Sequence, residues 1–384
     1  MRYAVTVERD SLEESIVHCL RESPLTRNAM CDKLGVSRTT LSRALSELMD
    51  RGTVRAEVHS SGGRGRPVQT FHLSNDVVHA VGIDISRTHA SALAVNRLEQ
   101  QLCTARFRYY SDSSWESVLK KLCTELDHRM KEAGVETTSI HHVGVGMPMP
   151  IGIAVQDDGE RLIPDYAKLQ TYVEELWGAP TLIDNTIRMA ALVEARAGAG
   201  RGFDSQFYLR ISNGMMGCTV VSNRVVPGSQ GYAGEVGHLA FPGGAEHCIC
   251  GRNGCLETVA TMPAIIRHAQ ARDLEELLTK LSNNDPLAAA AVDQAAQAVA
   301  QACSQAVLFF NPARLILSGD VPAEIPEFVA KVNALLQEQL IPGLYNGVAC
   351  VSAELDGAQS VRGALFAGEA YAAMLESRHK KTRR

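Results

Sequence analysis

The sequence predicts an α/β body preceded by a small α+β domain, a winged helix-turn-helix. Three observations predict this: short helical patterns closed by a strand pair before residue 75, two later β-rich stretches separated by helices, and a shift in charge between the two parts. The 384 residues are enough for two or three domains, and 45% hydrophobic and 21% charged residues are ordinary for a globular protein. Two β-rich starts with helices between them favour a body of two similar halves.

The N-terminal part begins with three helical patterns. Apolar residues recur at helical spacing in residues 11–21, with Ser11 as a plausible N-cap. Two further helical patterns, 26–34 and 37–52, are separated by Gly35, which predicts a helix-turn-helix. The second of these helices presents short or cationic side chains able to reach bases and phosphates. These candidate DNA-binding residues are Ser37, Arg38, Thr39, Thr40, Ser42 and Arg43.

A wing is predicted after the helices. Two strand patterns, 53–59 and 69–73, flank a thin glycine-rich segment that carries Arg64 and Arg66, and paired arginines suit the narrow minor groove of A·T-rich DNA. Taken alone, the glycine-rich segment could equally be a flexible linker rather than a wing. A helix-turn-helix can also bind another protein instead of DNA. Residues 27–72 hold eight basic and four acidic side chains, a local +4 in a chain of net charge −5. A basic module on an acidic body favours DNA binding.

The body begins near residue 76 with a continuous apolar run, 77–85, which is typical of a buried central strand. Beyond residue 257 the chain is mostly helical, and its long Ala-rich segment 288–310 is interpreted as scaffold or oligomer contact. The cationic end, 379–384, is expected to be a disordered tail. No apolar run approaches the roughly 18–20 residues that cross a bilayer, and no signal-peptide pattern is present, so we expect a cytoplasmic protein with reduced cysteines.

A dense group of metal-ligating residues lies between residues 238 and 257. Cys248, Cys250 and Cys255 fall within eight residues, and His238 lies ten residues before the first of them. Three thiolates and one imidazole make a complete tetrahedral set for Zn²⁺. The alternative is a group of buried free cysteines, but this spacing in a polar, glycine-containing loop is a poor core pattern. The segment therefore predicts a zinc site.

These motifs resemble those of the ROK family (repressors, open reading frames and kinases), in its transcriptional-regulator branch with an N-terminal winged helix-turn-helix. Residues 37–42 and 65–67 look like the family's DNA-binding module, while 234–238 and 248–257 match its sugar and zinc motifs. The resemblance covers most of the chain and implies an actin-like (ribonuclease H-like) body whose two lobes close on a sugar. The implied domains are 1–75 for the winged helix-turn-helix, 76–198 plus 361–384 for the first lobe, and 199–360 for the second.

The resemblance also implies a sugar site. Its residues would be Asn185, Glu235, His238 and Glu257. Carboxylates are acceptors only, which suits sugar hydroxyls. Glu235 and Glu257 could instead be ordinary surface acids, but their placement beside three zinc ligands disfavours that alternative. His238 would bind zinc through one ring nitrogen and face the sugar with the other, and the four-ligand shell would make the zinc structural. Arg188, close by, would recognise a phosphate or carboxylate on the ligand or else form a surface salt bridge.

The catalytic features of the family's kinases are altered in this chain. The Asp-x-Gly-Gly-Thr phosphate loop corresponds to 84–88, where both glycines are missing, and the catalytic Asp corresponds to Thr186, whose hydroxyl is no general base near pH 7. The other two nucleotide loops, 211–217 and 318–320, are also changed. No catalytic residue is therefore predicted, and the chain is expected not to be an enzyme.

The leading hypothesis is a sugar-responsive transcriptional regulator, a repressor, of carbohydrate genes. Its partners would be operator DNA, a sugar or sugar-phosphate effector, and a second copy of the chain in a homodimer or homotetramer. One alternative is a ROK sugar kinase that carries a DNA-binding domain. Another is a regulator controlled by a protein partner rather than by a sugar.

Overall fold

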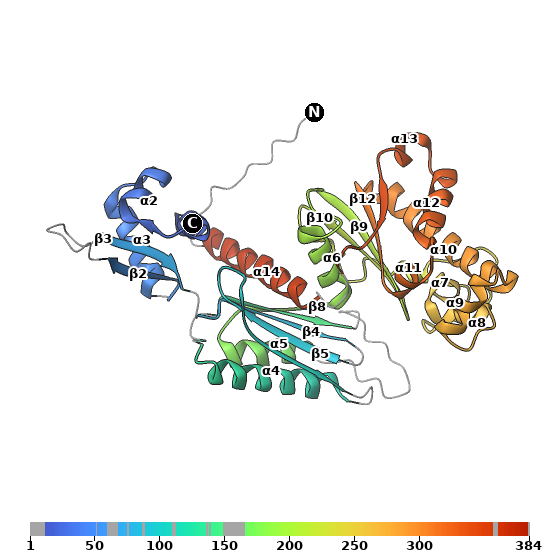
Figure 1. Ribbon diagram of the computed structural model, residues 1–384, viewed down its shortest axis with the longest axis horizontal. Coiled ribbons are helices and arrows are strands. Elements are labelled where there is room, and N and C mark those ends of the chain that lie inside the picture. Colours follow the sequence, from blue (N-terminus) through green and yellow to red (C-terminus); the bar gives the residue numbers. More distant parts are fainter. Residues whose placement is uncertain are drawn as a thin grey trace.

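The computed structural model describes residues 12–50, 52–59, 68–74, 77–86, 89–109, 113–135, 137, 140–148, 166–355 and 360–382. It contains an N-terminal module and two α/β halves, each built on a five-stranded sheet (Figure 1). The predicted N-cap Ser11 and the wing arginines Arg64 and Arg66 lie outside the described residues. Among the described residues no helix is both long and apolar enough to cross a membrane.

The N-terminal module has the predicted order of helix, turn, helix and strand pair. Gly35 ends the first helix of the turn with a φ of 66°, a conformation that favours glycine. The sheet order is β1-β3-β2, all antiparallel, and β1 is a strand too short for its pattern to predict. The elements are α1 (Leu12–Glu22), β1 (Leu25–Thr26), α2 (Arg27–Leu34), α3 (Arg38–Asp50), β2 (Val54–His59) and β3 (Val68–Leu73).

The first half contains the sheet β6-β5-β4-β7-β8. Strand β5 is antiparallel to both of its neighbours, β4 and β6, whereas β7 and β8 run parallel to β4. Its elements are β4 (Ala80–Ile85), β5 (His89–Val95), β6 (Gln101–Arg108), α4 (Trp115–Glu132), β7 (His142–Met147), α5 (Tyr166–Trp177) and β8 (Thr181–Asn185). All six residues of β4 are buried, as the apolar run predicted.

The second half repeats this topology with the sheet β11-β10-β9-β12-β13, which confirms two similar halves. Its strands are β9 (Ser205–Ile211), β10 (Met215–Val221), β11 (Arg224–Val225), β12 (Arg314–Ser318) and β13 (Ala349–Ser352). Its helices are η1 (Val236–His238), α7 (Glu257–Ala260), α8 (Met262–His268), α9 (Leu274–Ser282), α10 (Pro286–Phe310), α11 (Asp320–Glu324), α12 (Phe328–Gln339) and α13 (Pro342–Tyr345).

Two helices, α6 (Thr186–Ala197) and α14 (Ser360–Thr382), connect the halves (Figure 1). Met189 of α6 shares a buried cluster with Tyr208 of β9 and Ala364 of α14. Helix α14 also packs on β7 so closely that a Cβ on Gly144 would lie 1.8 Å from the carbonyl oxygen of Ala364, so this position requires glycine. The helix continues to Thr382, so the expected disorder of the tail is wrong up to that residue.

The Ala-rich helix α10 is a scaffold. All of its alanines except Ala289 and Ala290 are buried in the large core of the second half, where small side chains let the neighbouring helices approach closely. The apolar residues at its C-terminal end are different, because Leu308, Phe309 and Phe310 are 66%, 78% and 51% exposed. Helix α10 therefore exposes an apolar surface at its C-terminal end, whereas most of its alanines are buried.

Candidate metal centre and ligand pocket

The cysteine loop is folded back on itself beside η1. Isolated β-bridges join Ala240 to Cys255 and His247 to Asn253. Gly254 has a φ of 72°, and a Cβ at this residue would lie 2.3 Å from the carbonyl oxygen of Gly244. Glycine is therefore required at this position for the loop to close. The closure turns the three thiols toward one centre, as the sequence predicted.

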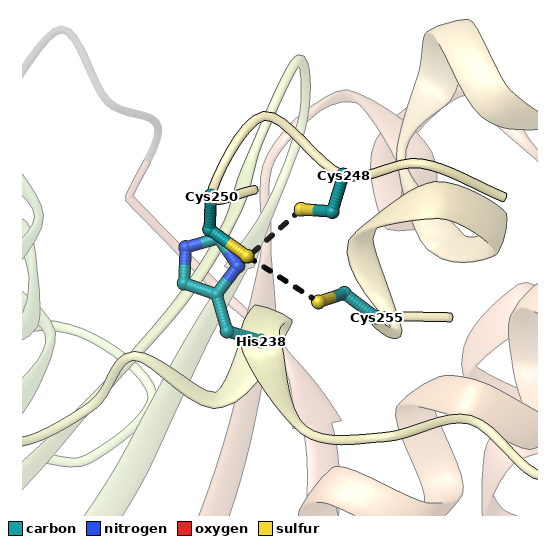
Figure 2. A group of neighbouring side chains, drawn as sticks. All are labelled: His238, Cys248, Cys250 and Cys255. Carbon is teal, nitrogen blue, oxygen red and sulfur yellow. Dashed lines mark hydrogen bonds between the residues drawn. The ribbon is translucent and has the colours of Figure 1, made fainter. Parts of the chain in front are cut away.

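The four predicted metal ligands lie together (Figure 2). The ligand atoms of His238, Cys248, Cys250 and Cys255 are all within 4.8 Å of one another. Cys248 Sγ lies 3.6 Å from His238 Nδ1, and Cys250 Sγ lies 3.6 Å from Cys255 Sγ. Zinc bonds of about 2.3 Å to sulfur and about 2.0 Å to nitrogen imply ligand separations of about 3.5–3.8 Å in a tetrahedron. The donor set and its spacing therefore fit Zn²⁺, and the sulfur separation is too long for a disulfide.

Arg252 supplies a positive charge that the motif alone did not indicate. Its guanidinium donates to the backbone carbonyl of His238 at 2.6 Å. Burial raises the pKa of the Cys250 thiol, but hydrogen bonds with the backbone and side chain of Arg252 and with Cys248 and Cys255 together lower the pKa to about 6. A thiolate is the form that binds metal. Three thiolates around Zn²⁺ carry one net negative charge, which Arg252 offsets.

Two carboxylates adjoin the metal ligands. Glu257 Oε2 lies 3.6 Å from His238 Nδ1, and Oε1 accepts a hydrogen bond from the backbone N–H of Met215 at 3.3 Å. Glu235 Oε1 is buried and has no hydrogen-bond partner within the part of the chain that the structure describes. Burial raises the pKa of Glu235, against the opposing effects of His238 and Arg188. A buried acceptor without a partner fits a ligand hydroxyl.

Asn185 and Arg188 connect α6 to this pocket. Asn185 is buried and caps α6, since its side chain accepts from the N–H of Ile187 at 2.8 Å. Arg188 donates to Asp184 at 2.8 Å and also to the backbone carbonyl of Gly231, in the loop that leads to Glu235. Arg188 is only 3% exposed, so a surface salt bridge is the wrong interpretation of this residue.

Three of the four predicted sugar residues lie in one cluster, and the fourth, Asn185, lies at the start of α6. Glu235, His238 and Glu257 lie in one cluster of interacting charges. Asn185 caps α6, the helix from which Arg188 donates to Gly231 in the loop that leads to Glu235. The Nε of Arg188 is a buried donor that has no partner among the described residues. Arg188 Nε and Glu235 Oε1 are thus a buried donor and a buried acceptor that both lack partners among the described residues.

The positions that carry catalysis in ROK kinases are occupied by internal contacts. Thr186 Oγ1 donates to the carboxylate of Asp84, and burial raises the pKa of Asp84 in spite of this hydrogen bond. In the second half of the body, Ser212 Oγ accepts a hydrogen bond at 3.1 Å from the backbone N–H of Asp320, the residue after Gly319. A backbone N–H that already has a partner is not available to bind phosphate.

Helix α3 presents its predicted DNA-binding side chains on the outside of the module. Ser37 caps the helix by accepting from the N–H of Thr40 at 3.2 Å. Arg38 Nε donates to Asn28 at 3.1 Å, which holds the guanidinium at the start of the helix. The exposed residues of the predicted set are Ser37, Arg38, Thr39, Thr40 and Arg43, and Ser42 is half-buried.

Comparisons with known proteins agree with this architecture. Residues 80–368 match the model of the ROK family. The xylose repressor of Caldicellulosiruptor bescii is 23% identical over 346 residues, 84% of this chain and 86% of the repressor. A ROK hexokinase from Thermus thermophilus matches with a TM-score of 0.66 and 28% identity, over 76% of this chain and 98% of the enzyme. A ROK family transcriptional regulator, a homologue of E. coli MLC, matches with a TM-score of 0.72 and 20% identity, over 94% of this chain and 97% of its own. The predicted ROK fold, an actin-like body preceded by a winged module, is confirmed.

Proposed function

The chain belongs to the ROK family, and we propose that it is a sugar-responsive transcriptional repressor that binds DNA and has no kinase activity. The combination of two observations supports this proposal. Glu235 Oε1 is a buried acceptor without a hydrogen-bond partner among the described residues, and Thr186 and Ser212 make internal hydrogen bonds at positions that the family resemblance assigns to catalysis and nucleotide binding. The xylose repressor, which the chain resembles over 84% of its length, points the same way. A repressor that binds operator DNA would act in the cytoplasm, where bacterial DNA lies.

Each part of the chain has a role in this proposal. Residues 1–75 bind operator DNA, residues 76–198 with 361–384 form one lobe, and residues 199–360 form the other. Zinc on His238, Cys248, Cys250 and Cys255 is structural, because four protein ligands leave no open position. The zinc fixes His238, whose remaining ring nitrogen faces the effector. The DNA-binding residues are those of α3 together with Arg64 and Arg66.

The effector is a sugar or sugar phosphate, and xylose is the first to test because of the relative's name. A ligand shifts an equilibrium only through different affinities for two arrangements. Arg188 could couple effector binding to the arrangement of the lobes. It joins the loop around Gly231, which leads to Glu235, to α6, and α6 packs between both sheets. A tenfold preference for the arrangement that does not bind DNA corresponds to about 1.4 kcal/mol of coupling.

A sugar kinase is the second candidate, favoured by the 28% identity to a hexokinase over the body. Incubation with ATP and a panel of pentoses and hexoses separates the two functions. We expect effector binding without formation of sugar phosphate. Phosphorylation that depends on Asn185, measured by loss of the product in Asn185→Ala, would instead establish the kinase and refute the proposal.

Glu235→Gln is expected to weaken effector binding roughly ten- to hundredfold. A hydrogen bond to a charged acceptor contributes about 1.5–3 kcal/mol, and the amide is a weaker acceptor of nearly the same shape. Isothermal titration with the sugar found in a thermal-shift screen measures the effect. The control is Glu338→Gln, an exposed position on α12. Equal affinities in the two variants would remove Glu235 from the sugar site.

Phe309→Glu is expected to dissociate the proposed homodimer or homotetramer. Leu308, Phe309 and Phe310 form an exposed apolar end of α10, and a buried charge at such a contact is costly. Light scattering coupled to gel filtration should give a smaller mass for the variant. Leu287→Glu, at the opposite end of the same helix and also exposed, is the control that should keep the wild-type mass. An unchanged mass for Phe309→Glu would place the oligomer contact elsewhere.

A further inference from the structure

Three histidines from two distant segments meet at one end of the first sheet. His79 directly precedes β4, and His141 and His142 lie at the start of β7, which is parallel to β4. The backbone N–H of His141 donates to the carbonyl of His79 at 2.7 Å, which fixes the two segments side by side. No sequence motif connects these residues, because the parallel pairing of β4 and β7 is what brings them together.

The geometry of the three rings is that of a ligand set. Each ring offers one nitrogen, and these nitrogens all lie within 4.8 Å of one another. Nδ1 of His141 lies 3.4 Å from Nδ1 of His142. The ring of His142 is nearly perpendicular to those of His79 and His141, at 84° and 89°, so the rings are not stacked as a parallel set. Metal–nitrogen bonds of about 2.0–2.1 Å in a tetrahedron imply nitrogen separations of about 3.4 Å.

We propose that His79, His141 and His142 form a second metal site, for a divalent transition ion such as Zn²⁺ or Ni²⁺. Three imidazoles suit these ions rather than Mg²⁺ or Ca²⁺, which take oxygen ligands. Among the described residues the site has three protein ligands, so water would complete the coordination. It is separate from the cysteine site in ligand type and in position, since it belongs to the first half of the body.

Of the three histidines, His142 is held in place by its surroundings, whereas His79 and His141 are partly accessible to solvent. His142 is buried, with 4% exposure, and its ring also hydrogen-bonds to the backbone of Leu365 on α14. A second hydrogen bond of this kind orients a metal-binding imidazole. His79 and His141 are only half-buried, so an ion can enter from solvent. The cluster therefore has both a fixed ligand and an entry side.

The position of the site gives the ion a structural consequence. His79 ends the connection between β3 of the N-terminal module and β4 of the body. Leu98, in the turn between β5 and β6, packs against the core of the module, so the module and the body are in contact here. An ion bound to His79, His141 and His142 would tie the end of that connection to β7, and through His142 to α14.

Titration of the full-length, zinc-containing protein with Ni²⁺ tests the proposal. We expect wild type to bind one Ni²⁺ per chain in addition to its zinc, and His79→Gln and His141→Gln each to weaken this binding at least tenfold. His128→Gln is the control, because His128 is an exposed histidine on α4. Both test positions are half-buried, and circular dichroism verifies that the variants fold. Absence of the additional Ni²⁺ in wild type, or unchanged affinity in both variants, overturns the proposal.

Cys250→Ser separates this site from the cysteine site. If the histidines bind the ion, Co²⁺ added to Cys250→Ser gives a visible spectrum without strong thiolate charge-transfer bands, and His141→Gln in the same background loses it. Strong charge transfer that survives His141→Gln would assign the ion to the remaining cysteines and overturn the proposal.

Discussion

Cys250→Ser is expected to abolish zinc binding at the cysteine site and, with it, the response to sugar. Serine keeps its proton near neutral pH and is a poor zinc ligand, so the site is left with three donors. Loss of an outer hydrogen-bond partner of a metal ligand already weakens metal binding about 10–100-fold, and loss of a direct ligand should weaken it further. Zinc per chain, measured by mass spectrometry after dialysis, should fall well below one equivalent.

The loss of sugar binding follows from what the ion holds. His238 lies in η1, a single short turn, and Cys248 and Cys255 lie in a loop closed by isolated bridges rather than by a sheet. Without an ion, little else fixes the ring of His238 against Glu257. Zinc present at a thousand times its dissociation constant stabilises the folded state by about 4.1 kcal/mol, so the variant should also melt at a lower temperature.

Cys31→Ser is the control for this experiment. Cys31 is a half-buried cysteine of α2 in the N-terminal module, far along the chain from the metal ligands. It should retain a full equivalent of zinc and normal sugar binding. If Cys250→Ser bound the sugar as tightly as wild type does, the proposed dependence of the pocket on zinc would be disproved.

The metal centre was predictable because its information is local. All four ligands lie within eighteen residues, and their residue types and glycines specify both chemistry and turn geometry. The two-half body was predictable for a similar reason, since each buried strand such as β4 is a continuous apolar run. The same local character made the helix-turn-helix visible through Gly35 and Ser37.

What the sequence could not give depends on contacts between distant segments. The sequence left a surface salt bridge open for Arg188 because arginine is usually exposed. The structure buries Arg188 because α6 packs between two sheets. The three histidines are grouped by strand pairing, and the pattern of β7 holds no sign of its neighbour. Likewise, the cationic end of α14 resembled a free tail, although positive charge also suits the last turn of a helix.

Arg38→Ala and Arg66→Ala are expected to weaken operator binding in two different ways. Arg38 is exposed at the start of α3 and is held by Asn28, and we propose that it contacts a base edge. Its loss should cost about 1–3 kcal/mol, or roughly five- to 150-fold in affinity, and should relax specificity at one position. Operators obtained by selection from random DNA, with binding measured by fluorescence anisotropy, provide this comparison.

Arg66 should act through charge and groove width instead. A cation that lies along the backbone or in a narrow minor groove contributes about equally to every sequence of similar shape, so Arg66→Ala should weaken binding uniformly. The slope of log K against log salt should become less negative by about one. Zinc content should not change, and Arg272→Ala, which removes an exposed arginine just before α9, should behave as wild type. The two substitutions are expected to change operator binding differently, Arg38→Ala in sequence specificity and Arg66→Ala in salt dependence. Unchanged affinity in Arg66→Ala would therefore refute a role of the wing in DNA binding, and α3 would remain the proposed base-contacting element.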